Sequence, residues 1–206
     1  MKAHGPTPDH DQSTPDNFAI VAVASSAGGI HGLSVLLEAL GTGLPVPLLI
    51  VQHLDPRHGT VIADVLGRRT PLRTKLAEDG EQALPGVVYI APPNHHLLIG
   101  ADGVLALSSS ELVHFVRPSA DLLFESLAGA YGPRAIACVL TGSGYDGAMG
   151  VDAVKSRGGT VIAEDPRTAE FRGMPEAAVE TGAVDFVLPL NEIATVIRGL
   201  VETKRQ

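Results

Sequence analysis

The chain has 206 residues, of which 45% are hydrophobic but only 4% aromatic, and it contains no Trp. This length fits one well-buried domain. An aliphatic composition of this kind is typical of a parallel sheet covered on both faces. The formal net charge of −8 argues against general nucleic-acid binding, which needs a positive surface.

The same sequence predicts a cytoplasmic protein. No apolar run approaches the ~20 residues of a membrane span, so direct membrane insertion is not expected. The N-terminus lacks the charged-then-apolar pattern of a signal peptide. The single cysteine, Cys138, lies in an apolar run and is expected to be a buried structural thiol.

Residues 1–17 combine Pro, Asp and His with almost nothing apolar, which predicts a disordered tail. Residues 18–206 are then expected to form one catalytic domain in which strands and helices alternate. The predicted strands are 18–24, 46–52, 87–91, 135–140, 159–163 and 184–188. The predicted helices are 29–40, 59–68, 119–131, 146–156, 174–181 and 191–203.

This alternation predicts an α/β fold with three layers, doubly wound, around a mostly parallel sheet. One stretch breaks the rhythm. The runs 96–99 and 104–107 flank Gly100-Ala-Asp-Gly103, which is the pattern of an added β-hairpin beside the main sheet.

Three predicted strands end in residues that carry chemistry. The first runs into Ser25-Ser26, the second into His53, and the third into a glycine-rich loop that contains Asp146. The carboxyl ends of parallel strands share one edge of the sheet, where ligands bind. A serine hydroxyl needs an imidazole to take its proton, and the imidazole needs a carboxylate to orient it. The sequence therefore predicts Ser26 as nucleophile, His53 as general base and Asp146 as its partner, in a chain order that α/β hydrolases do not use.

Ser26 is preferred to Ser25 because a small-x-Ser-x-Gly elbow fits Ala24-Ser-Ser-Ala-Gly28 only with Ser26 at its centre. Gly28 and Gly29 after it suggest free N–H groups of the kind an oxyanion hole needs. The alternative is that both hydroxyls only cap the following helix. Near the same edge, His95 and His96 are expected to line the pocket.

Other interpretations of these residues stay open. His53 could be a core histidine, and Asp146 could be a simple N-cap. A metal site of His53, His58, His95 and Asp146 is conceivable, but no helical His pair or Cys-rich spacing supports it. A dinucleotide site would need a G-x-G-x-x-G that is absent. We therefore expect no metal and no cofactor.

Taken together, these motifs resemble the catalytic domain of the CheB-type protein-glutamate methylesterases of chemotaxis. The segment from Ser25 to Gly29 is similar to the family's Ser-(Thr/Ala)-Gly-Gly elbow, and Val51-Gln-His-Leu54 to its Gln-His motif. Leu140–Gly147 is similar to its Leu-Thr-Gly-Met-Gly-x-Asp-Gly segment. Supporting matches run in family order over residues 18–200, namely Tyr89–His96, Arg117-Pro-Ser119 and Gly173-Met-Pro175.

The resemblance implies a serine hydrolase that removes methyl esters from glutamates on the cytoplasmic helices of methyl-accepting chemoreceptors, and that deamidates glutamine in some members. By motif, it assigns Ser26, His53 and Asp146 the three catalytic roles. It places the oxyanion hole and pocket near Ser143 and Gly144, with Ala27 and Gly28 from the elbow.

The chain departs from the family pattern in two respects. Ser143 replaces a Met, and Ala24 stands near a position usually held by Gly. We also expect no receiver domain, so a separate response-regulator protein is the expected regulator. Two other functions stay open: a non-catalytic chemosensory binding module, and a general serine esterase for small esters.

Overall fold

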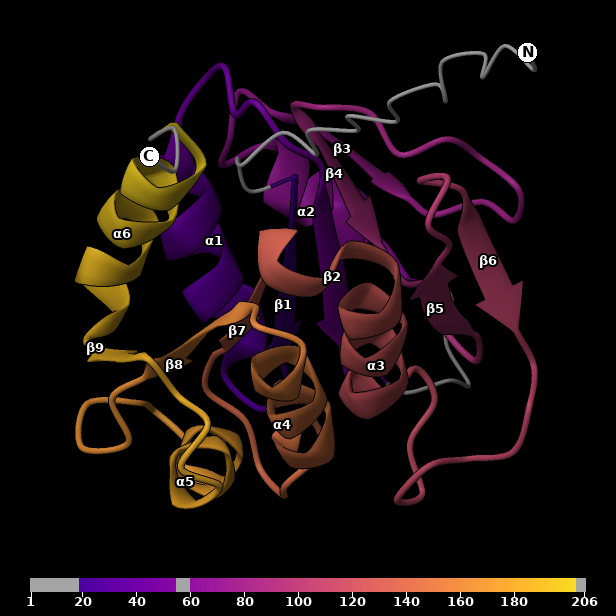
Figure 1. Ribbon diagram of the computed structural model, residues 1–206. Helices are drawn as coiled ribbons and strands as arrows, with labels where there is room; N and C mark the ends of the chain where they lie inside the picture. The colour runs from indigo at the N-terminus through magenta and orange to yellow at the C-terminus, as the bar shows by residue number, and fades with distance from the viewer. Residues whose placement is uncertain (1–18, 55–59, 203–206) are drawn as a thin grey trace, which may run out of the picture.

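The computed structural model describes residues 19–54 and 60–202 (Figure 1). Seven parallel strands form the main sheet in the order β3-β4-β2-β1-β7-β8-β9. These strands are β1 (Ile20–Ser25), β2 (Leu48–Gln52), β3 (Arg73–Leu76), β4 (Val87–Ile90), β7 (Ala135–Val139), β8 (Thr160–Glu164) and β9 (Phe186–Leu188). The antiparallel hairpin consists of β5 (His96–Ile99) and β6 (Leu105–Ser108).

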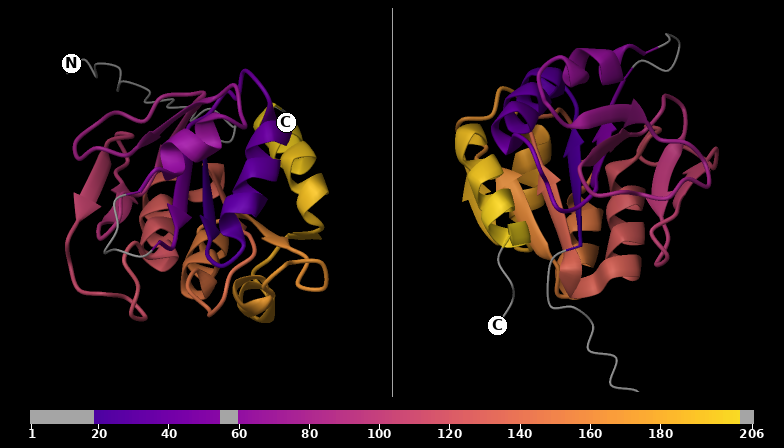
Figure 2. Two further views of the ribbon diagram at one scale, coloured as in Figure 1. Left: turned by 180° about the vertical axis from the view of Figure 1, so that it is seen from behind. Right: turned by 90° about the horizontal axis from the view of Figure 1, so that it is seen from above.

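The helices lie in two layers on either side of the sheet (Figure 2). They are α1 (Gly29–Leu40), α2 (Ile62–Gly67), α3 (Ala120–Tyr131), α4 (Ala148–Ser156), α5 (Gly173–Glu180) and α6 (Leu190–Glu202), and a short 3₁₀ turn, η1 (Gly132–Arg134), follows α3. Apolar side chains of α1, α2 and α6 share one core with one face of the sheet. Side chains of α3, α4, α5 and the hairpin share a second core with the opposite face. Among the described residues, no helix is long and apolar enough to cross a bilayer.

This architecture confirms the predicted three-layer α/β fold with its added hairpin. The central strands are fully buried runs of aliphatic residues, as expected for a sheet covered on both faces. β3 was not among the predicted strands; it reads Arg-Thr-Lys-Leu and occupies an edge of the sheet. The predicted tail at 1–17 lies outside the described residues.

The order of the strands explains where a site can form. β2, β1 and β7 are adjacent, and the chain leaves β1 toward one face of the sheet but leaves β7 toward the other. Ligands bind at such a topological switch point, outside the carboxyl ends of the strands. At this edge Ser25 pairs in register with Gln52, and Ala24 with Val139.

Candidate functional site

The turn from β1 into α1 exposes one serine and buries the other. Ser25 is fully buried, and its hydroxyl donates to Gln52 Oε1 at 2.7 Å. Ser26 is half-buried. Its N–H donates to the Thr141 carbonyl at 3.0 Å, and its carbonyl accepts from Gln52 Nε2 at 2.8 Å. The backbone of Ser26 is thus held on both sides, while its hydroxyl has no recorded partner among the described residues.

Neither serine caps α1. The N-cap position is Gly28, with φ +73° and no side-chain hydrogen bond to the helix, a backbone conformation that favours glycine. Gly29 is required by space, because a Cβ there would overlap Gln52 Oε1 and lie 2.8 Å from Ser25 Oγ. The capping interpretation of the two hydroxyls is therefore wrong. Gly28 allows the left-handed turn into α1, and Gly29 allows the close approach of β2.

His53 follows β2 and contacts Asp146, which lies just before α4. Its Nε2 lies 2.8 Å from Asp146 Oδ2. The side chains of His53 and Asp146 are 14% and 5% exposed, so the pair is shielded on most sides but open at the imidazole. Since Nε2 faces the carboxylate, Nδ1 is the nitrogen left to face a substrate or the Ser26 hydroxyl.

Asp146 is also tied to the first turn of α3. Its Oδ1 accepts from Ser119 Oγ at 2.8 Å and from the Asp121 N–H at 3.2 Å, and its Oδ2 accepts from the Ala120 N–H at 2.6 Å. Burial alone would raise the pKa of Asp146, but the hydrogen bonds from His53, Ala120 and Ser119 outweigh it and hold that pKa below its ordinary value. Asp146 is thus an ionised carboxylate with fixed orientation.

Asp121, in the first turn of α3, in turn accepts hydrogen bonds from the start of α4. Its Oδ1 accepts from the N–H groups of Gly147 at 3.0 Å and Gly150 at 2.8 Å. Its buried Oδ2 has no hydrogen-bond partner among the described residues and lies 3.4 Å from His114 Nε2. Burial raises the pKa of Asp121, and the negative charge of Asp146 adds to the shift. The two aspartates therefore lock α3 and α4 together beside His53.

A pocket of about 160 Å³ opens beside His53. Leu112, Phe115 and Arg117 line it together with Asn94. The Arg117 guanidinium fixes this rim by donating to Asn94 Oδ1 at 2.6 Å and to the carbonyls of residues 109 and 110. Phe115 is 92% exposed, so the pocket has an apolar lip that points into solvent.

The structure also places the remaining predicted pocket residues. Ala27 and Gly28 lie in the elbow, and Ser143 and Gly144 lie exposed on the loop after β7. None of the four backbone N–H groups of Ala27, Gly28, Ser143 and Gly144 donates a backbone hydrogen bond within the described part of the chain. They are therefore available as donors.

The histidine pair after β4 divides between two environments. His95 lies near this edge, with its Nδ1 3.0 Å from the Pro93 carbonyl. Asn94, rather than His95, is among the residues that line the pocket beside His53. His96 is fully buried.

Three site neighbours were given no role by the sequence analysis: Gln52, Ser119 and Met174. Met174 is 1% exposed, and its N–H donates to the Gly142 carbonyl at 2.9 Å. A Cβ at Gly142 would overlap Met174 Sδ and lie 2.9 Å from Ser26 Cβ. All three residues stand inside the motifs quoted for the family resemblance, which is the signal that could have found them.

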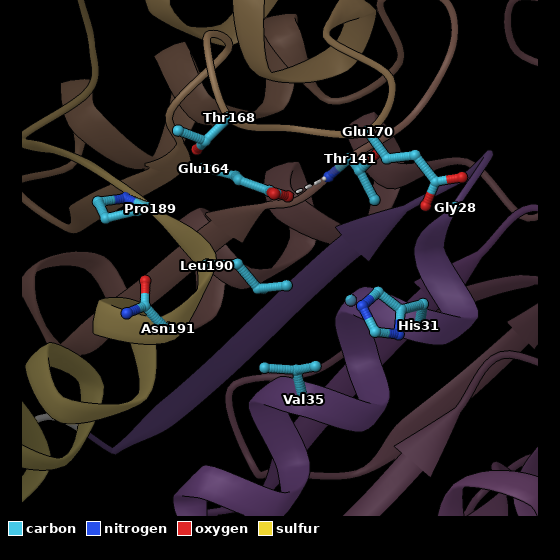
Figure 3. Close-up of a pocket in the computed structure, with 11 residues that line it drawn as sticks. Gly28, His31, Val35, Thr141, Glu164, Thr168, Glu170, Pro189, Leu190 and Asn191 are labelled. Atoms are coloured by element: carbon cyan, nitrogen blue, oxygen red, sulfur yellow. Dashed lines mark hydrogen bonds between the residues drawn. The ribbon is translucent and has the colours of Figure 1, made fainter.

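A larger pocket of about 580 Å³ lies on the α1 and α6 side of the elbow, lined by residues that include Gly28, His31 and Thr141 (Figure 3). The 3% exposed Glu164 stands at its wall and accepts from the Thr141 N–H at 2.7 Å. Burial raises the pKa of Glu164, although the bond from Thr141 opposes the shift. Glu164 thus anchors the start of the loop that carries Asp146.

The structure gives no support to the metal alternative. Within residues 19–54 and 60–202, no group of three or more His, Cys, Asp or Glu side chains is arranged to hold a metal ion. His58, one of the four ligands of that alternative, lies outside the described residues.

Comparison with known proteins gives consistent matches over nearly the whole chain. The family model described as "CheB methylesterase" matches residues 21–197. The crystal structure of the Thermotoga maritima CheB methylesterase catalytic domain superposes with a TM-score of 0.85 at 40% identity. That match covers 89% of this chain and 98% of the Thermotoga chain.

Relatives of two lengths match. A Leptospira interrogans protein is 40% identical over 178 residues, which are 86% of this chain and 92% of that protein. The protein-glutamate methylesterase/protein-glutamine glutaminase 1 of Paramagnetospirillum magneticum is 41% identical over 96% of this chain, which spans 53% of that longer protein. The match to the family model, the sequence identities and the shared fold show that the chain belongs to the CheB methylesterase family.

Proposed function

We propose that this protein is a protein-glutamate methylesterase, a carboxylic ester hydrolase that demethylates glutamate methyl esters on the cytoplasmic helices of chemoreceptors and deamidates glutamine there. Support comes from family membership and from relatives whose names carry both activities. The observation that carries the mechanism is the contact between His53 Nε2 and Asp146 Oδ2, next to a strand end that presents the Ser26 hydroxyl.

In the proposed first step, Ser26 Oγ attacks the ester carbonyl while His53 Nδ1 takes the hydroxyl proton. Asp146 keeps the proton of His53 on Nε2 and stabilises the imidazolium that forms. The carbonyl oxygen becomes an oxyanion and accepts hydrogen bonds from free amide N–H groups, for which Ala27, Gly28, Ser143 and Gly144 are the candidates.

The second half of the reaction returns the enzyme to its starting state. Collapse of the tetrahedral intermediate expels methanol, which takes the proton from His53 Nδ1. Water then attacks the acyl-enzyme while His53 Nδ1 accepts its proton. That proton passes to Ser26 Oγ as the acyl bond breaks, and the glutamic acid leaves and ionises to its carboxylate. With a glutamine side chain the same steps release ammonia in place of methanol.

This proposal also covers the domain and its partners. Residues 18–206 would act as one methylesterase-like catalytic domain, in the cytoplasm where receptor signalling helices lie. We also propose a second partner, a separate response-regulator protein. Cross-linking of purified regulator and enzyme, with and without regulator phosphorylation, tests that partner.

The direct test of the activity is methanol release from methylated receptor fragments. The wild type should release methanol and Ser26→Ala should not. Ser25→Ala is the matched control, since it removes a hydroxyl one residue away whose partner is Gln52, and it should retain activity. Undiminished release by Ser26→Ala would refute the assignment, and hydrolysis of small chromogenic esters without release from receptor fragments would favour a general esterase.

A further inference from the structure

A buried histidine lies behind the site and takes no part in the proposed chemistry. His96, the first residue of β5, has no solvent exposure. Its Nδ1 lies 3.1 Å from the Ser119 backbone N, and its Nε2 lies 3.0 Å from the Glu111 carbonyl oxygen. Both ring nitrogens are therefore engaged with the backbone.

These two partners fix the tautomer of His96. A backbone N–H can only donate, so Nδ1 must carry a lone pair. A carbonyl oxygen can only accept, so Nε2 must carry the proton. His96 is thus a neutral imidazole with one defined tautomer, and neither a second proton nor the other tautomer fits these contacts.

Ser119 connects this histidine to the catalytic carboxylate. Its N–H donates to His96 Nδ1, while its hydroxyl donates to Asp146 Oδ1 at 2.8 Å. Ser119 is fully buried and Asp146 is 5% exposed, so water does not compete for this hydrogen bond. The other oxygen of the same carboxylate faces His53 Nε2. The Ser119 hydroxyl is therefore one of the donors that orient the carboxylate facing the base.

We propose that His96 and Ser119 are positioning residues for Asp146. His96 holds Ser119 through its Nδ1, and Ser119 holds the Asp146 carboxylate in the plane that His53 requires. The inference rests on the proposed function, because it concerns the efficiency of the same catalytic group. It assigns to His96 a role inside the fold, distinct from the pocket-lining role expected for His95 and His96.

The two sides of His96 can be tested separately by amide substitutions. The amide oxygen of Asn reaches the position of Nδ1, whereas the amide group of Gln reaches the position of Nε2. We expect His96→Asn to keep kcat within about threefold of wild type, since it still accepts from Ser119. His96→Gln should lower kcat about tenfold or more with little change in KM. Ser119→Ala should lower kcat roughly tenfold to a hundredfold, the effect of losing one hydrogen bond to a charged group.

Ser126→Ala is the matched control. The Ser126 hydroxyl also joins α3 to β5, donating to the Leu123 carbonyl at 2.8 Å and accepting from the Ile99 N–H at 3.2 Å, but it does not touch Asp146. A loss of stability in this variant without a loss of kcat would separate packing between α3 and β5 from positioning. A drop in kcat equal to that of Ser119→Ala would overturn the proposal.

The rate at which a fluorophosphonate probe labels Ser26 tests the positioning role of His96 and Ser119 separately from the proposed methylesterase function. If wild-type Ser26 is not labelled, the proposed function fails. If wild type is labelled and both His96→Gln and Ser119→Ala are labelled at the same rate, only the positioning role fails. Equal losses of kcat in His96→Asn and His96→Gln would also overturn it.

One measurement needs no variant that could misfold. Nitrogen-15 NMR of the histidine side chains in the wild type should find His96 with a proton on Nε2 alone at neutral pH. A proton on Nδ1 would contradict the geometry from which the positioning role is inferred.

Discussion

Adding a single methyl group at Gly142 should damage the site more than the fold. The Cβ of Ala at this position would overlap Met174 Sδ and lie 2.9 Å from Ser26 Cβ and 3.0 Å from Met174 Cγ. The Met174 side chain can bend away, but Ser26 is held by its backbone bonds to Thr141 and Gln52. Ser26 must move by about half an ångström or more to reach ordinary contact, and displacements of about 1 Å cost on the order of 100-fold in rate.

We therefore expect Gly142→Ala to lower kcat for methanol release roughly 10- to 100-fold. Overpacking should also lower the free energy of unfolding by about 1–3 kcal/mol. Timed assays of methanol release measure the loss of kcat, and urea unfolding measures the loss of unfolding free energy. In a double-mutant cycle with Met174→Ala, the stability cost of Gly142→Ala should shrink, because the overlaps with Met174 are removed. The loss of kcat should persist, because the contact with Ser26 remains.

Gly32→Ala is the control for this prediction. It lies in α1, where its Cβ would meet Thr141 Cγ2 at 3.5 Å and Leu140 Cδ1 at 3.8 Å, which is ordinary contact. Replacing a helical glycine should raise stability by up to about 1 kcal/mol and leave kcat unchanged. Wild-type kcat and stability in Gly142→Ala would refute the reasoning about Ser26.

Three further results are expected. Ser25→Ala should lose about 1–2 kcal/mol of unfolding free energy in urea titrations, because a buried hydrogen bond to Gln52 disappears; unchanged stability would contradict that account. Asp146 has a pKa below its unfolded value, so its stabilisation is complete above about pH 4 and is lost as pH falls through the folded pKa. The difference in unfolding free energy between wild type and Asp146→Asn should therefore be largest near neutral pH and should shrink in acid, whereas a difference that grows in acid would contradict the sign. Burial raises the pKa of the Cys138 thiol, so a disulfide reagent should leave the native protein unmodified and react fully only in guanidinium; rapid native reaction would contradict its burial.

Much of the fold could be predicted because its strands are apolar runs of four to six residues separated by helical patterns. The helix at 29–40 agrees with α1 at both ends. β3 could not be found in this way, because an edge strand of Arg, Thr, Lys and Leu has little apolar signal. Its place in the sheet comes from pairing with β4, which no local pattern encodes.

In the candidate site, too, some features could be predicted from the sequence and others could not. Ser26, His53 and Asp146 could be singled out because each follows the end of a predicted parallel strand, where side chains of distant segments converge. The positioning contacts of Ser119 and His96 could not be predicted, because they join residues that lie 27 and 23 positions apart in the sequence. A serine at the start of a helix looks like an N-cap. Here its hydroxyl instead donates to a carboxylate that lies just before the neighbouring helix.

The central claim is that Ser26, activated by His53 and Asp146, is the nucleophile. Its most direct test is to treat the native protein with a fluorophosphonate and map the adduct by peptide mass spectrometry. The account predicts one adduct on Ser26, none on Ser25, and none anywhere in Ser26→Ala. An adduct on another residue, or labelling that survives in Ser26→Ala, would contradict it.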